Sequence, residues 1–134
     1  MSDSVDLHRS RSLARVDYAY AASAGPGRKL LFLAGACPLD AQGNTVAVGN
    51  YAAQAAQCIT NLRAALSEAG ASLHDVVSTR VLVASAERED LVTAWNVVRD
   101  AFAPHEPPST LYGVPVLGYE HQLVEIEAVA AVRA

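Results

Sequence analysis

The sequence contains only two cysteines, Cys37 and Cys58, and they do not form a CxxC pair. This spacing argues against a disulfide scaffold or a zinc knuckle, and it suits a reducing compartment. No apolar run approaches the roughly 18 residues that a membrane-spanning helix needs. No apolar segment followed by a cleavage site stands at the N-terminus. These absences predict a cytoplasmic protein that does not contact the membrane.

Basic residues are also scarce, with 10 Lys and Arg against 14 Asp and Glu and a net charge of −4. Nucleic-acid binding needs clustered cations, so it is not expected. His74, His105 and His121 are isolated, and no metal-ligand spacing appears, so we expect no metal. Of these, only His121 stands at a predicted turn from which it could reach the rim of a cleft.

What remains is a short, apolar chain of 134 residues, 51% hydrophobic and 18% charged. This composition predicts one globular domain. Residues 1–13 are polar and of mixed charge, so we expect a flexible tail followed by a single domain at 14–134. The high apolar share indicates that some surface is buried between subunits.

Periodicity predicts two helices and several strands. The first helix has apolar residues at three- and four-residue steps, with Asn50 as its cap and Gly70 closing its end. The second begins near Ser85 or Ala86 and ends before Pro104. Apolar or alternating stretches predict strands at 15–22, 29–36, 45–48, 76–84, 110–117 and 122–132.

The last two predicted strands carry the main functional signal. They flank a turn at 118–121, which favours a hairpin. On the last strand Glu125 and Glu127 share one face, where burial is costly unless the carboxylates are paired or used. Two helices cover only one face of a sheet, so the other apolar face predicts self-association.

Three segments resemble the Rid family, also called YjgF/YER057c/UK114: LFLAGACPLDAQG (31–43), NLRAALSEAGASLHDVV (61–77) and PPSTLYGVPVLGYEHQLVEIEAVA (107–130). The resemblance implies an α+β, chorismate-mutase-like fold of β-β-β-α-β-α-β-β order, with a mixed sheet backed by two helices. It implies a homotrimer with a small-molecule cleft at each subunit boundary, and no metal or organic cofactor.

The resemblance also implies chemistry. The deaminase branch hydrolyses enamines or imines such as 2-aminoacrylate to a keto acid and ammonia. In that branch an arginine binds the substrate carboxylate, and a glutamate, matched here by Glu125, positions or activates water. The family pattern P-x-R-[ST] meets Pro107-Pro108-Ser109-Thr110 here. Serine cannot reproduce a two-pronged charged contact, so we expect an arginine-lacking subgroup that uses 2-aminoacrylate poorly. Arg80 is the candidate replacement cation.

Other cleft positions follow from the same resemblance or from their place in the matched segments. A tyrosine near the first strand corresponds to either Tyr18 or Tyr20, and packing in the core explains both equally well. The remaining candidates for substrate binding are Gly35, Ala36, Asn96, Ser109, Thr110 and Tyr112. Gly35 further indicates a bulge or a close backbone approach.

Three functions are therefore weighed. The first is a hydrolase or deaminase of small C–N substrates, with Glu125 as its catalytic residue. The second is a non-catalytic trimeric small-molecule-binding module in which Glu125 is a structural carboxylate. The third, endoribonuclease or translation inhibitor, follows an old label of the family and is disfavoured by the acidic charge.

Overall fold

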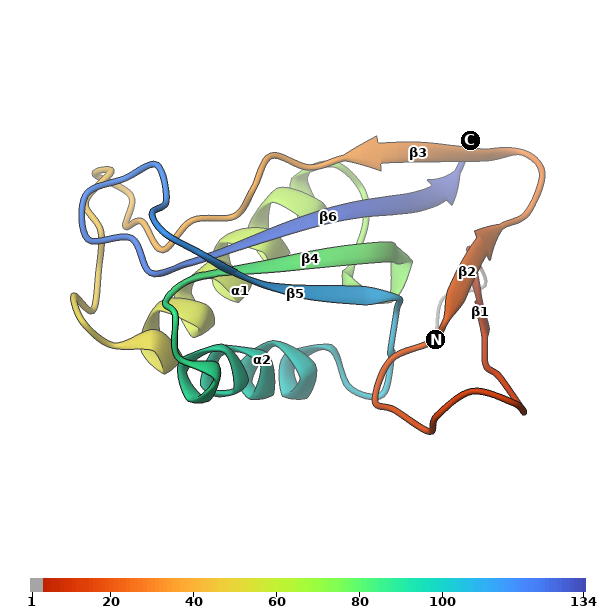
Figure 1. Cartoon of the computed structure of the whole chain (residues 1–134). Helices are drawn as coiled ribbons and strands as arrows, with labels where there is room; N and C mark the ends of the chain where they lie inside the picture. The colour runs from red at the N-terminus through yellow and green to blue at the C-terminus, as the bar shows by residue number, and fades with distance from the viewer. Residues whose placement is uncertain (1–3) are drawn as a thin grey trace.

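A computed structural model describes residues 4–134 and shows a four-stranded mixed sheet with two helices on one face (Figure 1). The predicted α+β class, with two helices against a mixed sheet, is confirmed. The elements are β1 (Val5–His8), β2 (Ala21–Ala24), β3 (Arg28–Phe32), α1 (Tyr51–Glu68), the 3-10 turn η1 (Leu73–Asp75), β4 (Val76–Ala84), α2 (Arg88–Phe102), β5 (Ser109–Val114) and β6 (Val124–Arg133).

The main sheet has the order β3-β6-β4-β5. β6 pairs antiparallel with both β3 and β4, whereas β4 and β5 run parallel because α2 crosses between them. The predicted hairpin of the last two strands is therefore wrong, since β4 lies between β5 and β6. β6, which is apolar along one whole face, lies in the interior of the sheet between β3 and β4. The loop 115–123 takes the chain from β5 past β4 to β6.

The N-terminal part also differs from its prediction. Strand β1 lies inside the segment expected to be a flexible tail, and it pairs antiparallel with β2 in a separate ribbon. Residues 15–20 are irregular, so the strand predicted at 15–22 begins only at Ala21. The strand predicted at 29–36 ends at Phe32, and the extended piece at 45–48 contributes one bridge, from Thr45 to Leu39.

Helix α1 has the boundaries that its capping residues favour, whereas α2 begins later than predicted. The Asn50 side chain accepts a hydrogen bond from Ala53 N at 2.9 Å, and Gly70 has φ 88°, so both predicted caps of α1 are confirmed. Helix α2 begins at Arg88 rather than at Ser85, because the Ser85 hydroxyl accepts a hydrogen bond from Glu87 N and holds a turn there. It ends before Pro104, as predicted.

The core lies between the sheet and the helices. Alternate residues of β6, from Val124 through Ile126 to Ala130, are fully buried against Leu62 of α1 and Val98 of α2. Each large buried aliphatic side chain contributes roughly 2 kcal/mol. Among residues 4–134, neither helix combines the length and apolar character that crossing a membrane requires.

The other face of the sheet stays uncovered in a single chain, as the helix count predicts (Figure 1). Leu30 is 50% exposed and Phe32 is 76% exposed, although both are large apolar residues. The candidate site lies on this open face.

Candidate functional site

The strand register arranges the open face in three rows of side chains, because residues directly opposite each other point to the same side of a sheet. The rows are Phe32–Val129–Ser78, Glu127–Arg80–Thr110 and Glu125–Leu82–Tyr112. Successive rows are about 7 Å apart, since each is displaced by two residues along the strands. Glu125 and Arg80 therefore occupy neighbouring rows of one surface.

Glu125 is half-buried at the end of this face that lies near residues 33–37. Its Oε1 accepts a hydrogen bond from Gln122 Nε2 at 3.1 Å and from Cys37 Sγ at 3.4 Å. Its Oε2 lies over the backbone of Gly35, where a Cβ atom would collide with it and come within 2.7 Å of Cδ. The close backbone approach predicted at Gly35 is thus present, and the group that approaches is the candidate catalytic carboxylate.

Backbone pairing holds residues 33–37 against β6. Ala36 exchanges two hydrogen bonds with Ile126, at 2.7 and 3.0 Å, so neither its N–H nor its carbonyl is left for a ligand. Asn61 of α1 donates to the carbonyl of Cys37 at 2.8 Å and to that of Leu39 at 2.9 Å. The backbone of Gly35 and Ala36 therefore forms a rigid surface under Glu125. The N–H of Ala36 is not available to donate a hydrogen bond to substrate.

Both thiols are unsuited to nucleophilic attack. Burial, followed by the charge of Glu125 and the hydrogen bond to it, raises the pKa of Cys37 to about 11, so this thiol is protonated at neutral pH. Burial also raises the pKa of Cys58, which donates to the carbonyl of Val124 at 3.4 Å in the core. Cys58 is fully buried and is therefore an inert thiol of the core.

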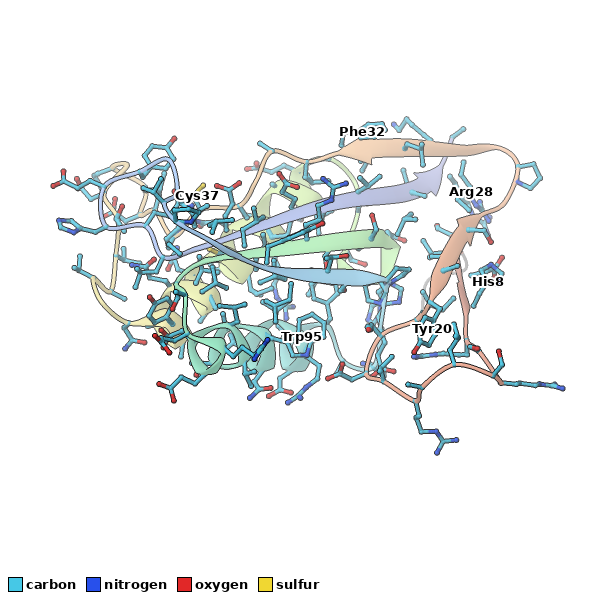
Figure 2. The ribbon with its side chains drawn as sticks, in the orientation of Figure 1. His8, Tyr20, Arg28, Phe32, Cys37 and Trp95 are labelled. Atoms are coloured by element: carbon cyan, nitrogen blue, oxygen red, sulfur yellow. The ribbon has the colours of Figure 1, made fainter. Side chains whose placement is uncertain are left out.

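A second group of candidates lies beyond Arg80, away from Glu125. Tyr18, Tyr20, Arg80 and Thr110 line a groove of about 390 Å³. The two tyrosine rings meet edge to face at 5.9 Å, and the Tyr20 hydroxyl donates to the carbonyl of Ala14 at 2.5 Å. Cys37, beside Glu125, and Tyr20 lie toward opposite ends of the molecule (Figure 2). The tyrosines therefore do not touch the candidate carboxylate within one chain.

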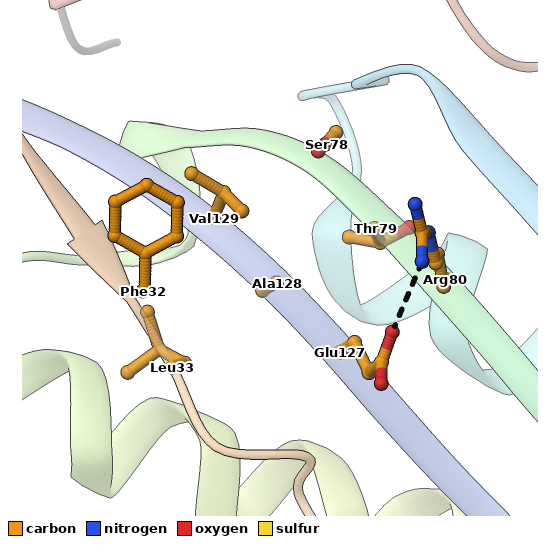
Figure 3. A pocket seen from close by; sticks show the side chains of 8 residues that line it. All are labelled: Phe32, Leu33, Ser78, Thr79, Arg80, Glu127, Ala128 and Val129. Carbon is orange, nitrogen blue, oxygen red and sulfur yellow. Dashed lines mark ion pairs between the residues drawn. The ribbon is translucent and has the colours of Figure 1, made fainter.

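Arg80 lines both this groove and a neighbouring hollow of about 320 Å³ (Figure 3). Its Nη1 lies 3.8 Å from Glu127 Oε1, and both side chains are well exposed. An exposed ion pair of that length contributes at most about 1 kcal/mol. The guanidinium can therefore exchange Glu127 for an anionic ligand at small cost.

Ser109, which stands at the family arginine position, is also among the residues that line the groove with Tyr18 and Tyr20, but its side chain lies on the opposite side of the sheet from Arg80. Thr79 donates to the Ser109 hydroxyl at 2.7 Å, and that hydroxyl donates to the carbonyl of Pro107 at 2.9 Å. Thr79 and its partner Ala128 are buried, so this row belongs to the helix-covered face. Thr110, the next residue, points to the open face beside Arg80.

Three other candidates are also separate from Glu125 or at its margin. Asn96 is exposed on α2, in the layer that covers the opposite face, and the structure does not bring it to Glu125. Tyr112 is 42% exposed at the end of the Glu125 row, beyond Leu82. His121 has φ 63° and an exposed ring that lies 3.5 Å from Glu120 Oε1, so it does not contact the site.

Gln122 is a site residue that sequence reasoning missed. It is buried and directly bonded to Glu125. The only local signal is a polar residue at the start of a strand, which is too common to single out. Among residues 4–134, no three His, Cys, Asp or Glu side chains gather as metal ligands.

Comparison with known proteins places these features in a wider context. The model of the family described as Endoribonuclease L-PSP matches residues 10–132. A RutC family protein of Pyrococcus abyssi is 33% identical over 100 residues, which are 75% of this chain and 76% of that protein. A RutC family protein of Pyrococcus horikoshii is 32% identical over 113 residues, or 84% and 85% of the two chains.

Solved structures agree on the fold. A protein of unknown function of the conserved Rid protein family from Yersinia pestis, YyfB, superposes with TM-score 0.89 at 24% identity, covering 96% of this chain and 99% of its own. A member of the YjgF/YER057c/UK114 family from Mycobacterium tuberculosis has TM-score 0.64 at 31% identity, covering 96% and 100%.

Proposed function

Because the chain belongs to the Endoribonuclease L-PSP family, the Rid or YjgF/YER057c/UK114 group, we propose that it is a hydrolase of small imines or enamines. The observation that carries this proposal is the hydrogen bonding of the Glu125 carboxylate. One carboxylate oxygen is bound by two donors, and no donor among residues 4–134 is bonded to the other. A half-buried carboxylate with one free oxygen can hold a water molecule in a fixed direction.

The chemistry needs only this group and water. Glu125 Oε2 accepts a proton of the water as its oxygen attacks the imine carbon, forming a carbinolamine. The proton then passes to the nitrogen. Oε2 next takes the hydroxyl proton of the carbinolamine and delivers it to the nitrogen as the C–N bond breaks, so that a carbonyl compound and ammonia leave. An enamine enters the same route after tautomerising to the imine. The balance is one C=N bond and one water in, one C=O bond and one ammonia out.

We assign the binding of the substrate's polar or anionic group to Arg80. It stands next to Thr110, which faces the open side of the sheet. The family pattern places its arginine one position earlier, at Ser109. The row that contains Arg80 is about 7 Å from the row of Glu125, a span that fits a small carboxylic acid with its C–N bond near the carboxylate. Arg80 points to the same side as Glu125, whereas Ser109 does not.

The roof of the cleft is proposed to come from other copies of the chain in a homotrimer. The open face is too apolar to stay in water, since Phe32 is 76% exposed in one chain. Packing these faces together would cover Phe32 and enclose the surface between Glu125 and Arg80. Exclusion of water by that enclosure strengthens the contacts of both charged groups.

The test uses neutral and anionic imines generated in place by an oxidase, with release of the carbonyl product as the measurement. We expect turnover by the wild type and a loss of at least about 100-fold in Glu125→Gln. Glu120→Gln, an exposed carboxylate of the preceding loop, is the matched control and keeps wild-type turnover. Full activity of Glu125→Gln would refute the proposal.

A second function, a small-molecule-binding module without chemistry, is favoured by one observation. The family arginine is absent, and the Ser109 hydroxyl that takes its place is bonded to Pro107 and Thr79. Ligand-induced thermal stabilisation without turnover would support this alternative. Ribonuclease activity is not proposed, because a net charge of −4 disfavours binding to a phosphate backbone.

A further inference from the structure

We propose that Gln122 and Cys37 are positioning residues that bind one oxygen of Glu125 and so leave the other to act on water. The inference rests on the proposed function, which it deepens. Cys37 and Gln122 lie inside two of the segments that resemble the Rid family, but the resemblance gave neither of them a role. Both reach Glu125 only through the fold, one from the loop before β6 and one from the segment after β3.

The orientation of the Gln122 amide is determined by its surroundings. Its Oε1 accepts a hydrogen bond from Tyr119 N at 3.0 Å, and its Nε2 donates to Val124 O and to Glu125 Oε1, both at 3.1 Å. The opposite orientation would place an NH₂ against an N–H and an oxygen against two acceptors. At 4% exposure, water cannot replace these partners. Gln122 is therefore a fixed donor to Oε1.

Cys37 supplies the second donor to the same oxygen. Its sulfur lies 3.4 Å from both Glu125 Oε1 and the carbonyl oxygen of Gly35, so its single proton chooses between two acceptors. With a pKa of about 11, the thiol keeps this proton across the neutral range. Because the charged acceptor is the stronger one, the proton is directed to Glu125.

The other oxygen has a different environment. Glu125 Oε2 lies over Gly35, and no hydrogen bond from any residue at 4–134 reaches it. The missing Cβ leaves space for the carboxylate to lie flat on the backbone. With Oε1 bound by two donors, rotation of the carboxylate is restrained, and Oε2 keeps one position over Gly35.

The first test measures geometry without needing turnover. Alkylation of Cys37 by iodoacetamide is followed by mass spectrometry from pH 7 to 11.5. In the wild type the rate rises toward a midpoint near pH 11. In Glu125→Gln two of the causes that raise the pKa of Cys37 are removed, so the midpoint falls while burial keeps it above the ordinary value of 9.0. An unchanged midpoint would overturn the contact and the inference with it.

The second test separates positioning from structure. Gln122→Glu keeps the acceptor for Tyr119 N and nearly the same volume, but it replaces the donor facing Glu125 by an acceptor. We expect kcat to fall roughly 10- to 100-fold with KM changed by less than about threefold. Gln42→Glu makes the same change of side chain at an exposed loop position with no bond to Glu125, and it leaves both quantities unchanged.

Cys37 is tested by rescue. Cys37→Ala removes the donor, and we expect kcat to fall roughly three- to tenfold, whereas Cys37→Ser retains a donor and restores most of the rate. Equal loss in both variants, or a Gln122→Glu enzyme with wild-type kcat, would overturn the positioning role. A wild type without turnover on any imine would refute the proposed function, whereas the alkylation midpoint would still decide the contact to Glu125.

Discussion

Replacing Gly35 by alanine is the sharpest single test of how the candidate carboxylate is placed. The φ of Gly35 is not in the left-handed region, so alanine fits the backbone there and any effect comes from contacts. An added Cβ would lie 2.7 Å from Cδ and 3.0 Å from Cγ of Glu125, against a normal separation of about 3.5–4.0 Å. Because the colliding group is a side chain, Glu125 can rotate away.

The rotation has two separate costs. Moving the carboxylate breaks its hydrogen bonds to Gln122 and Cys37, and a donor left without a partner costs about 1 kcal/mol. We therefore expect Gly35→Ala to lose about 1–2 kcal/mol of stability, or roughly 3–8 °C in Tm. Turnover depends on where the Glu125 carboxylate lies rather than on the stability of the fold. A displacement of the carboxylate by about 1 Å reduces turnover on the order of 100-fold.

The assay combines thermal unfolding with imine turnover in a double-mutant cycle. Gly35→Ala is compared with Glu125→Ala and with the double variant. In the double variant the three nearest contacts of the new methyl group are removed, so the added methyl lowers Tm less than it does in the wild type, while turnover stays absent. Two results would refute the reasoning: a Gly35→Ala protein with full activity, or a methyl group that costs the same stability whether or not Glu125 is present.

Two of the three further predictions concern the open face, and the third concerns the buried His105, which is bonded to Val76 at the start of β4. Phe32→Glu places a charge on the proposed subunit interface, and light scattering should show a single subunit where the wild type is a trimer; an unchanged mass would place the interface elsewhere. Arg80→Ala should raise KM for an anionic imine roughly tenfold or more and leave KM for a neutral imine unchanged, which steady-state kinetics with both substrates will decide. Burial lowers the pKa of His105 below its ordinary value. As pH falls below about 6.5, this histidine is therefore protonated in the unfolded chain before it is protonated in the folded chain, and the free energy of unfolding decreases. The wild-type Tm should therefore fall more between pH 7 and 5.5 than that of His105→Gln; parallel curves for the two proteins would contradict this.

Local patterns were sufficient wherever one element settles its own conformation. The caps at Asn50 and Gly70 bond to their own helix, so their residue types predicted both ends of α1. The alternation of β6 identified which side chains are buried, because side chains in a strand point to opposite faces in turn. That alternation placed Glu125 on the uncovered face, and the family resemblance identified it as the candidate catalytic carboxylate.

The strand order was beyond the reach of those patterns. Two neighbouring strand-like stretches separated by a short turn predict a hairpin, but β5 pairs with β4 and β6 lies on the far side of β4. The crossover through α2 and the central place of the most apolar strand are properties of the whole sheet. The same holds for β1, whose pairing with β2 orders residues that composition alone describes as a tail.

The amino-acid sequence by itself determined the two helices, the caps of α1, the long strands of the main sheet and the face of β6 on which Glu125 lies, because these depend on residues within one helix or strand. Only the tertiary structure decided which groups meet that carboxylate. Gln122 approaches from a loop and Cys37 from a segment 88 positions away in the chain, and their contacts exist because β6 pairs with residues 33–37. The direction of Ser109 was decided in the same way, since pairing with Thr79 turns its hydroxyl away from the face where Arg80 stands.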